Sequence, residues 1–102
     1  MTRVILSPQA RIDLLLIVAH LAAVAGPVTA DKWDRKLWNA IDGIAEFPGR
    51  GAPRSKLGAH TRIITVRPYI VFYEHVRGSG VANVLRVLRG QRKITRAMLR
   101  KR

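Results

Sequence analysis

The feature that most constrains the fold is a long apolar stretch framed by a helix start signal and a helix stop signal. Ser7-Pro8 places an N-cap residue before a proline at the first helical position, and Gly26-Pro27 ends the stretch. This pattern predicts a helix over residues 8–25. Its apolar side chains cover well over half of the helix circumference, more than one buried face requires; they include Leu14, Leu15, Leu16, Ile17, Val18 and Leu21.

Two explanations of this apolar excess are open. Either a second helix and a sheet enclose the helix, which we favour, or part of its surface awaits a partner. The most apolar part, residues 14–25, falls well short of the roughly 20 residues that a membrane span needs. We therefore expect a core helix in a soluble cytoplasmic protein without a membrane partner.

A second helix is expected to follow after a short turn. Val28-Thr29 opens it, with Thr29 as the expected N-cap, and Phe47-Pro48-Gly49 ends it. Between them runs an amphipathic stripe at helical spacing, made of Trp33, Leu37, Ala40, Ile41 and Ile44. The short connection predicts that the two helices form an antiparallel hairpin.

The remaining elements are expected to be strands. Residues 3–6 form a short β-branched run, and three further strands are predicted at 62–66, 69–76 and 81–88. The last three have short connections, so they should form an antiparallel meander with 69–76 at its centre. Proline and glycine content predicts a loop over 48–61, and Arg67-Pro68 a turn.

The order strand, helix hairpin, meander predicts an α+β fold. The hairpin should cover one face of the sheet and leave the other face partly open. The chain reads as a single domain over residues 1–102, with a basic tail over about 89–102 that forms either a short helix or a disordered end.

Charge is distributed unevenly along this domain. Residues 1–47 hold five bases and five acids, whereas residues 48–102 hold fourteen bases and Glu74 as the single acid, so the net charge of +13 lies in the second half. Such asymmetry predicts docking on an acidic or polyanionic partner.

Sites for metals, cofactors or phosphates are not indicated. The chain has no cysteine, which excludes disulfides and thiolate metal sites and fits a reducing compartment. The three histidines lack ligand spacing. The glycine-rich segment at 49–58 lacks the GK[ST] ending of a phosphate-binding loop.

Arginine is the residue type that could bind phosphate or carboxylate groups here. Arg62, Arg67, Arg86 and Arg89 lie in or beside the predicted strands and, with Lys56 and the tail, would form a basic surface around the sheet. Tyr69 and Tyr73 lie on one side of their strand with His75. These tyrosines either stack on bases or pack in the core, and we favour the core.

Several blocks spread over the chain resemble toxins of the ParE/RelE superfamily, the toxic half of bacterial type II toxin–antitoxin pairs. The blocks are Ser7-Pro8-x-Ala10, Asp13-Leu14-x-x-Ile17, Ile41-x-x-Ile44-x-x-Phe47-Pro48, Gly51-x-Pro53, Leu57-Gly58-x-x-Thr61-Arg62, Tyr69-Ile70-Val71-Phe72-Tyr73 and Val84-Leu85-Arg86-Val87-Leu88-Arg89-Gly90-Gln91-Arg92. Each is weak alone, but together they follow the family's order, and the expected elements match the fold that the resemblance implies.

The resemblance implies two possible targets. The ParE-like branch poisons DNA gyrase without a hydrolytic site, and the segment from Arg89 to Ile94 is close to its pattern, although Lys93 stands where an acidic residue is common. The RelE-like branch cuts messenger RNA in the ribosome and often uses a terminal histidine or tyrosine, which is missing after His75. We favour the ParE-like branch.

Candidate residues differ between the branches. In a nuclease, Arg62, Arg67 and Arg89 would contact phosphate and the transition state, with His75 as proton donor. In a gyrase inhibitor no catalytic residue is expected. Contacts to the target or the antitoxin would then come from the basic residues after the centre of the sheet: Arg86, Arg89, Arg92, Lys93 and Arg96.

In both branches the resemblance implies an acidic antitoxin encoded alongside, here ParD-like, whose C-terminal segment wraps the toxin in a heterotetramer or larger complex. A basic half of the chain would speed capture of such a segment. An apolar groove or strand edge would accept its helix or strand.

Overall fold

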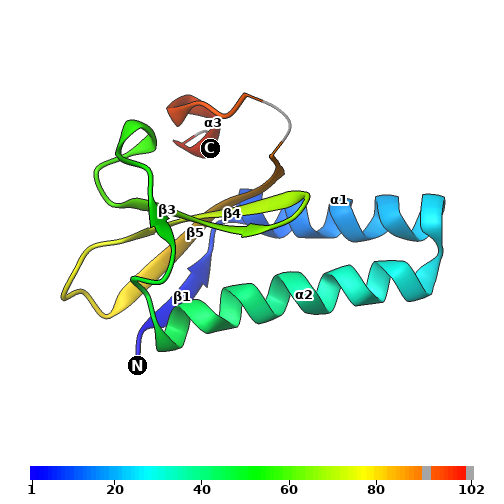
Figure 1. The fold of residues 1–102 in the computed structure, drawn as a ribbon, viewed down its shortest axis with the longest axis horizontal. Helices are drawn as coiled ribbons and strands as arrows, with labels where there is room; N and C mark the ends of the chain where they lie inside the picture. Colours follow the sequence, from blue (N-terminus) through cyan, green and yellow to red (C-terminus); the bar gives the residue numbers. More distant parts are fainter. Residues whose placement is uncertain (91–92, 101–102) are drawn as a thin grey trace.

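The computed structural model describes residues 1–90 and 93–100. It confirms the α+β class and the expected order of elements (Figure 1). In chain order they are β1 (Arg3–Leu6), α1 (Pro8–Ala25), α2 (Pro27–Glu46), β2 (Ala52–Pro53), a 3-10 turn (Ser55–Leu57), β3 (Thr61–Val66), β4 (Tyr69–His75), β5 (Val81–Arg89) and α3 (Arg96–Arg100).

The strands form one sheet in the order β1-β5-β4-β3-β2. The predicted meander of β3, β4 and β5 is antiparallel, and β1 joins it by pairing parallel to β5. β4 lies at the centre, as its apolar character on both faces predicted. The expected loop over 48–61 was partly wrong, because Ala52–Pro53 pairs with β3 as a two-residue edge strand.

The helix hairpin closes over a single glycine. Gly26 has a φ of 90°, a conformation that favours glycine, and Pro27 takes the first position of α2. The expected N-cap at Thr29 was therefore wrong: the N-cap is Gly26, and the helix starts three residues earlier than expected, at Pro27. α1 begins as predicted: the Ser7 hydroxyl accepts a hydrogen bond from the Ala10 amide at 3.0 Å.

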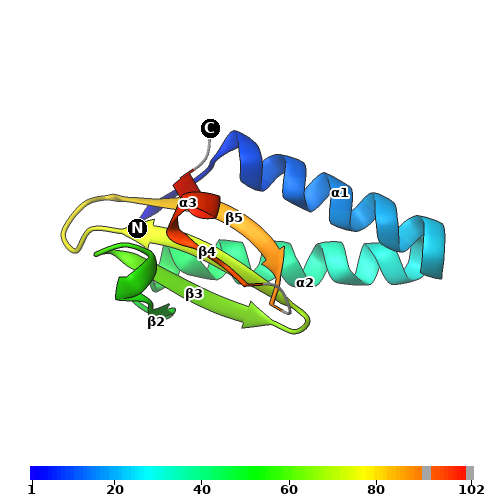
Figure 2. The same cartoon turned by 90° about the horizontal axis from the view of Figure 1, so that it is seen from above.

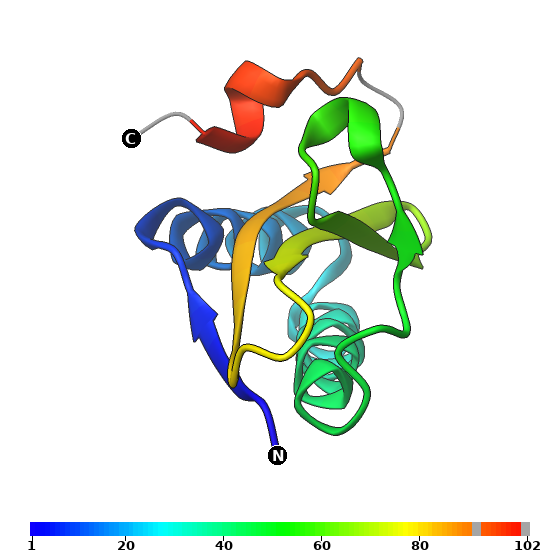
Figure 3. The same ribbon diagram turned by 90° about the vertical axis from the view of Figure 1, so that its left-hand side faces the viewer.

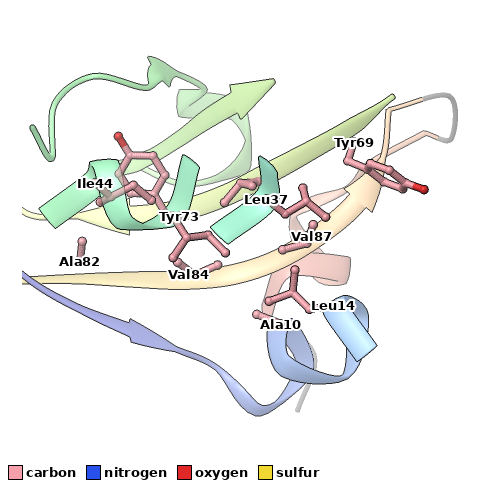
Figure 4. Close-up of a cluster of buried hydrophobic side chains, with 11 residues drawn as sticks. Ala10, Leu14, Leu37, Ile44, Tyr69, Tyr73, Ala82, Val84 and Val87 are labelled. Carbon is pink, nitrogen blue, oxygen red and sulfur yellow. The ribbon is translucent and has the colours of Figure 1, made fainter. Parts of the chain in front are cut away.

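The main core lies between the hairpin and the sheet (Figure 4). The predicted stripe of α2 is confirmed by Leu37, Ile41 and Ile44, which are fully buried there. Tyr69 and Tyr73 are also buried in this core, so they pack instead of offering faces for base stacking.

The opposite face of the sheet is less open than expected. α3 and the 3-10 turn lie on that side (Figure 3). A second small apolar cluster joins them to the sheet through Ile63, Phe72, Leu88 and Leu99. The basic tail therefore forms the short helix that was one of its two expected states, anchored by Leu99.

The favoured enclosure of α1 was wrong. Leu15 and Leu16 are 72% and 64% exposed, and Val24 is 65% exposed. The reason is geometric: α1 and α2 lie side by side in one layer, and both project past the strands (Figures 1 and 2). The distal part of α1 therefore has no sheet beneath it and no helix above it.

One carboxylate fixes α1 to the sheet. Asp13 accepts two hydrogen bonds from the Arg86 guanidinium, from Nε at 2.7 Å and from Nη2 at 2.9 Å, and a third from the Val87 amide at 2.9 Å. β1 pairs with β5 only as far as Val84, so the Asp13 side chain takes the place of a strand beyond that point. Arg86 also donates to the Met98 carbonyl at 3.0 Å, which ties in α3.

Tyr73 organises the segment between α2 and β2. Its hydroxyl donates to the Pro48 carbonyl at 2.7 Å and accepts from the Gly51 amide at 2.9 Å. A Cβ at Gly51 would lie 2.7 Å from that hydroxyl, so only glycine fits. Burial raises the pKa of Tyr73, while the Gly51 hydrogen bond and the charges of Arg62 and Arg50 act in the opposite direction.

Loss of the Asp13 carboxylate should cost much of the domain's stability. The Asp13 and Arg86 side chains are only 8% and 17% exposed, so Asp13→Ala leaves a desolvated guanidinium and an unpaired amide. We expect a loss of about 3–5 kcal/mol in urea unfolding. Asp31→Ala, which removes an exposed pair with Arg35, should cost about 0.5 kcal/mol or less. Equal losses in the two variants would contradict the anchoring role.

Tyr73→Phe should destabilise the domain by about 1–3 kcal/mol, because it leaves the Gly51 amide without its acceptor. Tyr69→Phe is the matched control, since the described residues give the Tyr69 hydroxyl no hydrogen bond.

The raised pKa of Tyr73 also predicts a pH dependence of stability. A raised pKa favours folding while the hydroxyl is neutral, so this contribution is lost as pH rises past the ordinary value of 10.0. Unfolding followed between neutral and alkaline pH should show that loss in the wild type and not in Tyr73→Phe.

Candidate partner-binding surfaces

An apolar surface covers the outer side of the helix hairpin. This surface contains a hollow of about 420 Å³. It is lined by Arg11, Leu14, Leu15, Val18, Asp34 and Trp38, and we call it the hairpin groove. Exposed Ile12 and Leu16 lie on the same helix. Exposed apolar surface of this kind makes the hairpin groove a candidate interaction site.

α1 is also long and apolar enough to cross a membrane when judged by length and composition alone, with a mean hydropathy of 1.4 over Pro8–Ala25. Core helices of soluble proteins pass the same test. Here the first half of α1 carries Ala10 and Leu14 into the core and bonds to β5 through Asp13. The exposed apolar side chains are therefore better matched to a protein partner than to lipid.

A second hollow lies on the other face of the sheet, at the turn between β3 and β4. It has a volume of about 450 Å³, and we call it the sheet hollow. Its lining consists of Arg54, Ile63, Thr65, Arg67, Pro68, Ile70 and Gly90. Arg54 and Arg67 are both exposed, so the hollow combines an apolar floor with a basic rim.

Two of the predicted site arginines serve the fold. Arg86 is bonded to Asp13, and this hydrogen bond raises its pKa. Arg62 donates through Nη1 to the carbonyls of Gly49 at 3.1 Å and Gly51 at 2.7 Å. Both guanidinium groups are therefore already engaged inside the domain.

The residues predicted for a nuclease do not converge. Arg89 pairs with Tyr69 across β5 and β4, beside the turn that holds Arg67, and its guanidinium lies 5.9 Å from the Tyr69 ring centroid. His75 lies at the opposite end of β4, where its Nδ1 is 3.0 Å from the Val81 carbonyl oxygen. The length of β4, roughly 20 Å at about 3.4 Å per residue, separates His75 from the two arginines.

The basic tail is partly described. Lys93 and Arg96 are exposed, so both are available to a target or an antitoxin. Arg92, predicted for the same role, lies outside the described residues. Among residues 1–90 and 93–100, no group of His, Asp and Glu side chains is arranged to hold a metal ion.

Sequence reasoning missed the partners of two acidic residues. In the sequence, Asp13 is part of a block that resembles the toxin family, yet its side chain joins α1 to β5. Glu74, the single acid of the second half, accepts from Arg100 at 2.8 Å and so holds α3 against the sheet. A single acid in apolar or basic surroundings was the available signal that each carboxylate has a partner. Spacing along the chain does not identify that partner, because Arg86 lies 73 residues from Asp13 and Arg100 lies 26 residues from Glu74.

Comparison with known proteins places this arrangement in a family. The model of the family described as "ParE toxin of type II toxin-antitoxin system, parDE" matches residues 4–94. A search of curated proteins gives no match. Among solved structures, the fold is similar to one titled "Chromosomal ParDE TA system from P. aeruginosa", with a TM-score of 0.74 and 21% sequence identity over 87% of this chain and 96% of that chain.

The structural similarity supports the fold, and the family match extends over most of the chain, from β1 to the segment before α3. The chain therefore belongs to the ParE toxin family of type II toxin–antitoxin systems.

Proposed function

We propose that this toxin acts in the cytoplasm by binding and inhibiting DNA gyrase, and that a cognate acidic antitoxin neutralises it. The observation that carries the proposal is the dispersal of the residues suited to RNA cleavage. Arg62 is engaged in the fold, and His75 lies at the opposite end of the sheet from Arg67 and Arg89. A surface that binds without hydrolysis accounts for this arrangement better than a nuclease site, and the family assignment agrees with it.

The hairpin groove is the proposed binding site for a helix of the antitoxin. An amphipathic helix would bury Leu15 and Trp38, which the isolated chain leaves exposed. The +13 charge of the second half would attract the acidic partner and speed its capture. The heterotetramer or larger complex implied by the family resemblance is part of this proposal.

Gyrase inhibition is tested with the purified chain. At stoichiometric toxin we expect supercoiling by gyrase to be blocked and cleaved DNA to accumulate, whereas messages in a translation extract remain intact. Intact supercoiling together with cut messages would reverse the assignment in favour of a ribosome-dependent endoribonuclease. If the antitoxin is mixed with the toxin before gyrase is added, supercoiling should proceed as it does without toxin.

Antitoxin binding at the hairpin groove is tested with Leu15→Glu. Leu15 is 72% exposed, so the variant should fold. A charge in the groove should weaken antitoxin binding by about tenfold or more, which corresponds to a loss of about 1.4 kcal/mol in binding free energy. Val76→Glu is the matched control, because Val76 is exposed on the loop side of β4, away from the groove. Calorimetric titration of each variant with the antitoxin gives the comparison. Equal affinities would place the antitoxin helix elsewhere.

A further inference from the structure

The outer edge of β3 is paired over only part of its length. β2 pairs with Arg62 and Ile63, and the Thr61 carbonyl accepts from the Arg54 amide at 2.9 Å. In an antiparallel ladder every second residue directs its backbone groups outward, so Thr65 continues the series of Thr61 and Ile63. Within the part of the chain that the structure describes, no strand pairs with Thr65 on this side. Its amide and carbonyl form a short open edge.

This open edge borders the sheet hollow. Thr65 itself lines the hollow, between the apolar floor of Ile63 and Ile70 and the rim arginines. Arg54 donates to the carbonyl of its neighbour Pro53 at 2.8 Å, and Arg67 makes no hydrogen bond or ion pair with the described residues. The rim charges are thus uncompensated by any acid among the described lining residues.

We propose that an extended acidic segment of the antitoxin adds to the edge of β3 at Thr65 and places a carboxylate between Arg54 and Arg67. This inference rests on the proposed function and adds a second contact on the face opposite the main helix core. Side chains of an extended strand alternate between its two faces. A segment with alternating acidic and apolar residues therefore directs its apolar side chains to one face of the sheet and its carboxylates to the rim.

The lining favours a peptide over single-stranded nucleic acid. Proteins that bind single strands stack the bases on aromatic side chains. The described lining of the sheet hollow contains no aromatic residue, and the tyrosines of β4 are buried in the core on the other face. An unpaired backbone edge, by contrast, bonds readily to another peptide backbone. Charge alone does not separate the two ligands, but the edge and the missing aromatics do.

Two variants of the full chain isolate the two parts of this contact. Thr65→Pro removes the outward amide without breaking the β3–β4 ladder, because proline is tolerated where the amide faces away from the sheet. Arg54→Gln combined with Arg67→Gln removes the rim charges. Arg3→Gln combined with Arg77→Gln is the matched control, since it loses the same charge from exposed arginines outside the hollow.

The probe is a capped peptide of about eight residues that alternates Val and Glu, a length typical of a strand. Its controls are the Val–Gln peptide and an oligothymidylate. We expect the acidic peptide to bind the wild type and the Arg3/Arg77 control equally, and about tenfold more weakly to the Thr65→Pro and Arg54/Arg67 variants. Binding should also protect the Thr65 amide from hydrogen exchange.

The same variants are then titrated with the whole antitoxin, and both should bind it more weakly than the Arg3/Arg77 control does. Equal antitoxin affinity in all variants overturns this inference while the toxin–antitoxin assignment stands. Tighter binding of the oligothymidylate than of the acidic peptide also overturns it, in favour of a nucleic-acid site. If the antitoxin fails to bind even the wild type, the proposed function itself fails, and the inference that depends on it falls with it.

Discussion

The arrangement of helices on the sheet depends on the Asp13 carboxylate. It lies where β1 has ended and β5 continues, and it bonds at once to the strand backbone and to the Arg86 side chain. Arg86 extends the connection to α3 through the Met98 carbonyl. One acidic side chain therefore links the first helix, the inner strand β5 and, through Arg86, the last helix. An apolar residue of similar size would pack but would leave the Val87 amide unpaired.

That anchor explains how a helix as exposed as α1 holds its place. A helix normally stays on a sheet by burying a continuous stripe, but α1 buries mainly its first half. The hydrogen bonds of Ser7 and Asp13 to β5 fix that half, and the single-glycine turn carries the rest alongside α2. The outward side of α1, from Leu15 to Val24, thus stays available for a partner. One helix therefore carries both core residues and the exposed residues of the hairpin groove.

Local sequence signals predicted the order of the main elements. Ser7-Pro8 and Gly26-Pro27 located both helices, and the double-sided apolar pattern of 69–76 located the central strand. Errors arose where the outcome depends on contacts between distant segments. The exposure of α1 depends on how far the hairpin projects past the strands, which helix periodicity does not contain. The pairing of Ala52–Pro53 with β3 depends on Tyr73 and Arg62 drawing in the preceding segment.

The candidate site was harder to predict than the fold for the same reason. All the basic residues of the second half look equivalent in sequence, yet Arg86, Arg62 and Arg100 are engaged in holding the domain together. The exposed arginines Arg54, Arg67 and Arg96 differ from them only in what lies nearby. An acidic residue 73 positions away decides the role of Arg86. Composition predicts that a basic surface exists, and the tertiary contacts decide which charges belong to it.

The Asp13 side chain also makes the two sides of the sheet chemically unlike. On the β5 side, β1 pairs with only part of β5, and beyond it the side chains of Ser7 and Asp13 bond to the β5 backbone that a further strand would otherwise join. On the β3 side, backbone groups remain accessible beyond a two-residue strand. Beyond β1 the free length of β5 is therefore occupied by side chains of Ser7 and Asp13, whereas the free length of β3 at Thr65 is open to a second backbone.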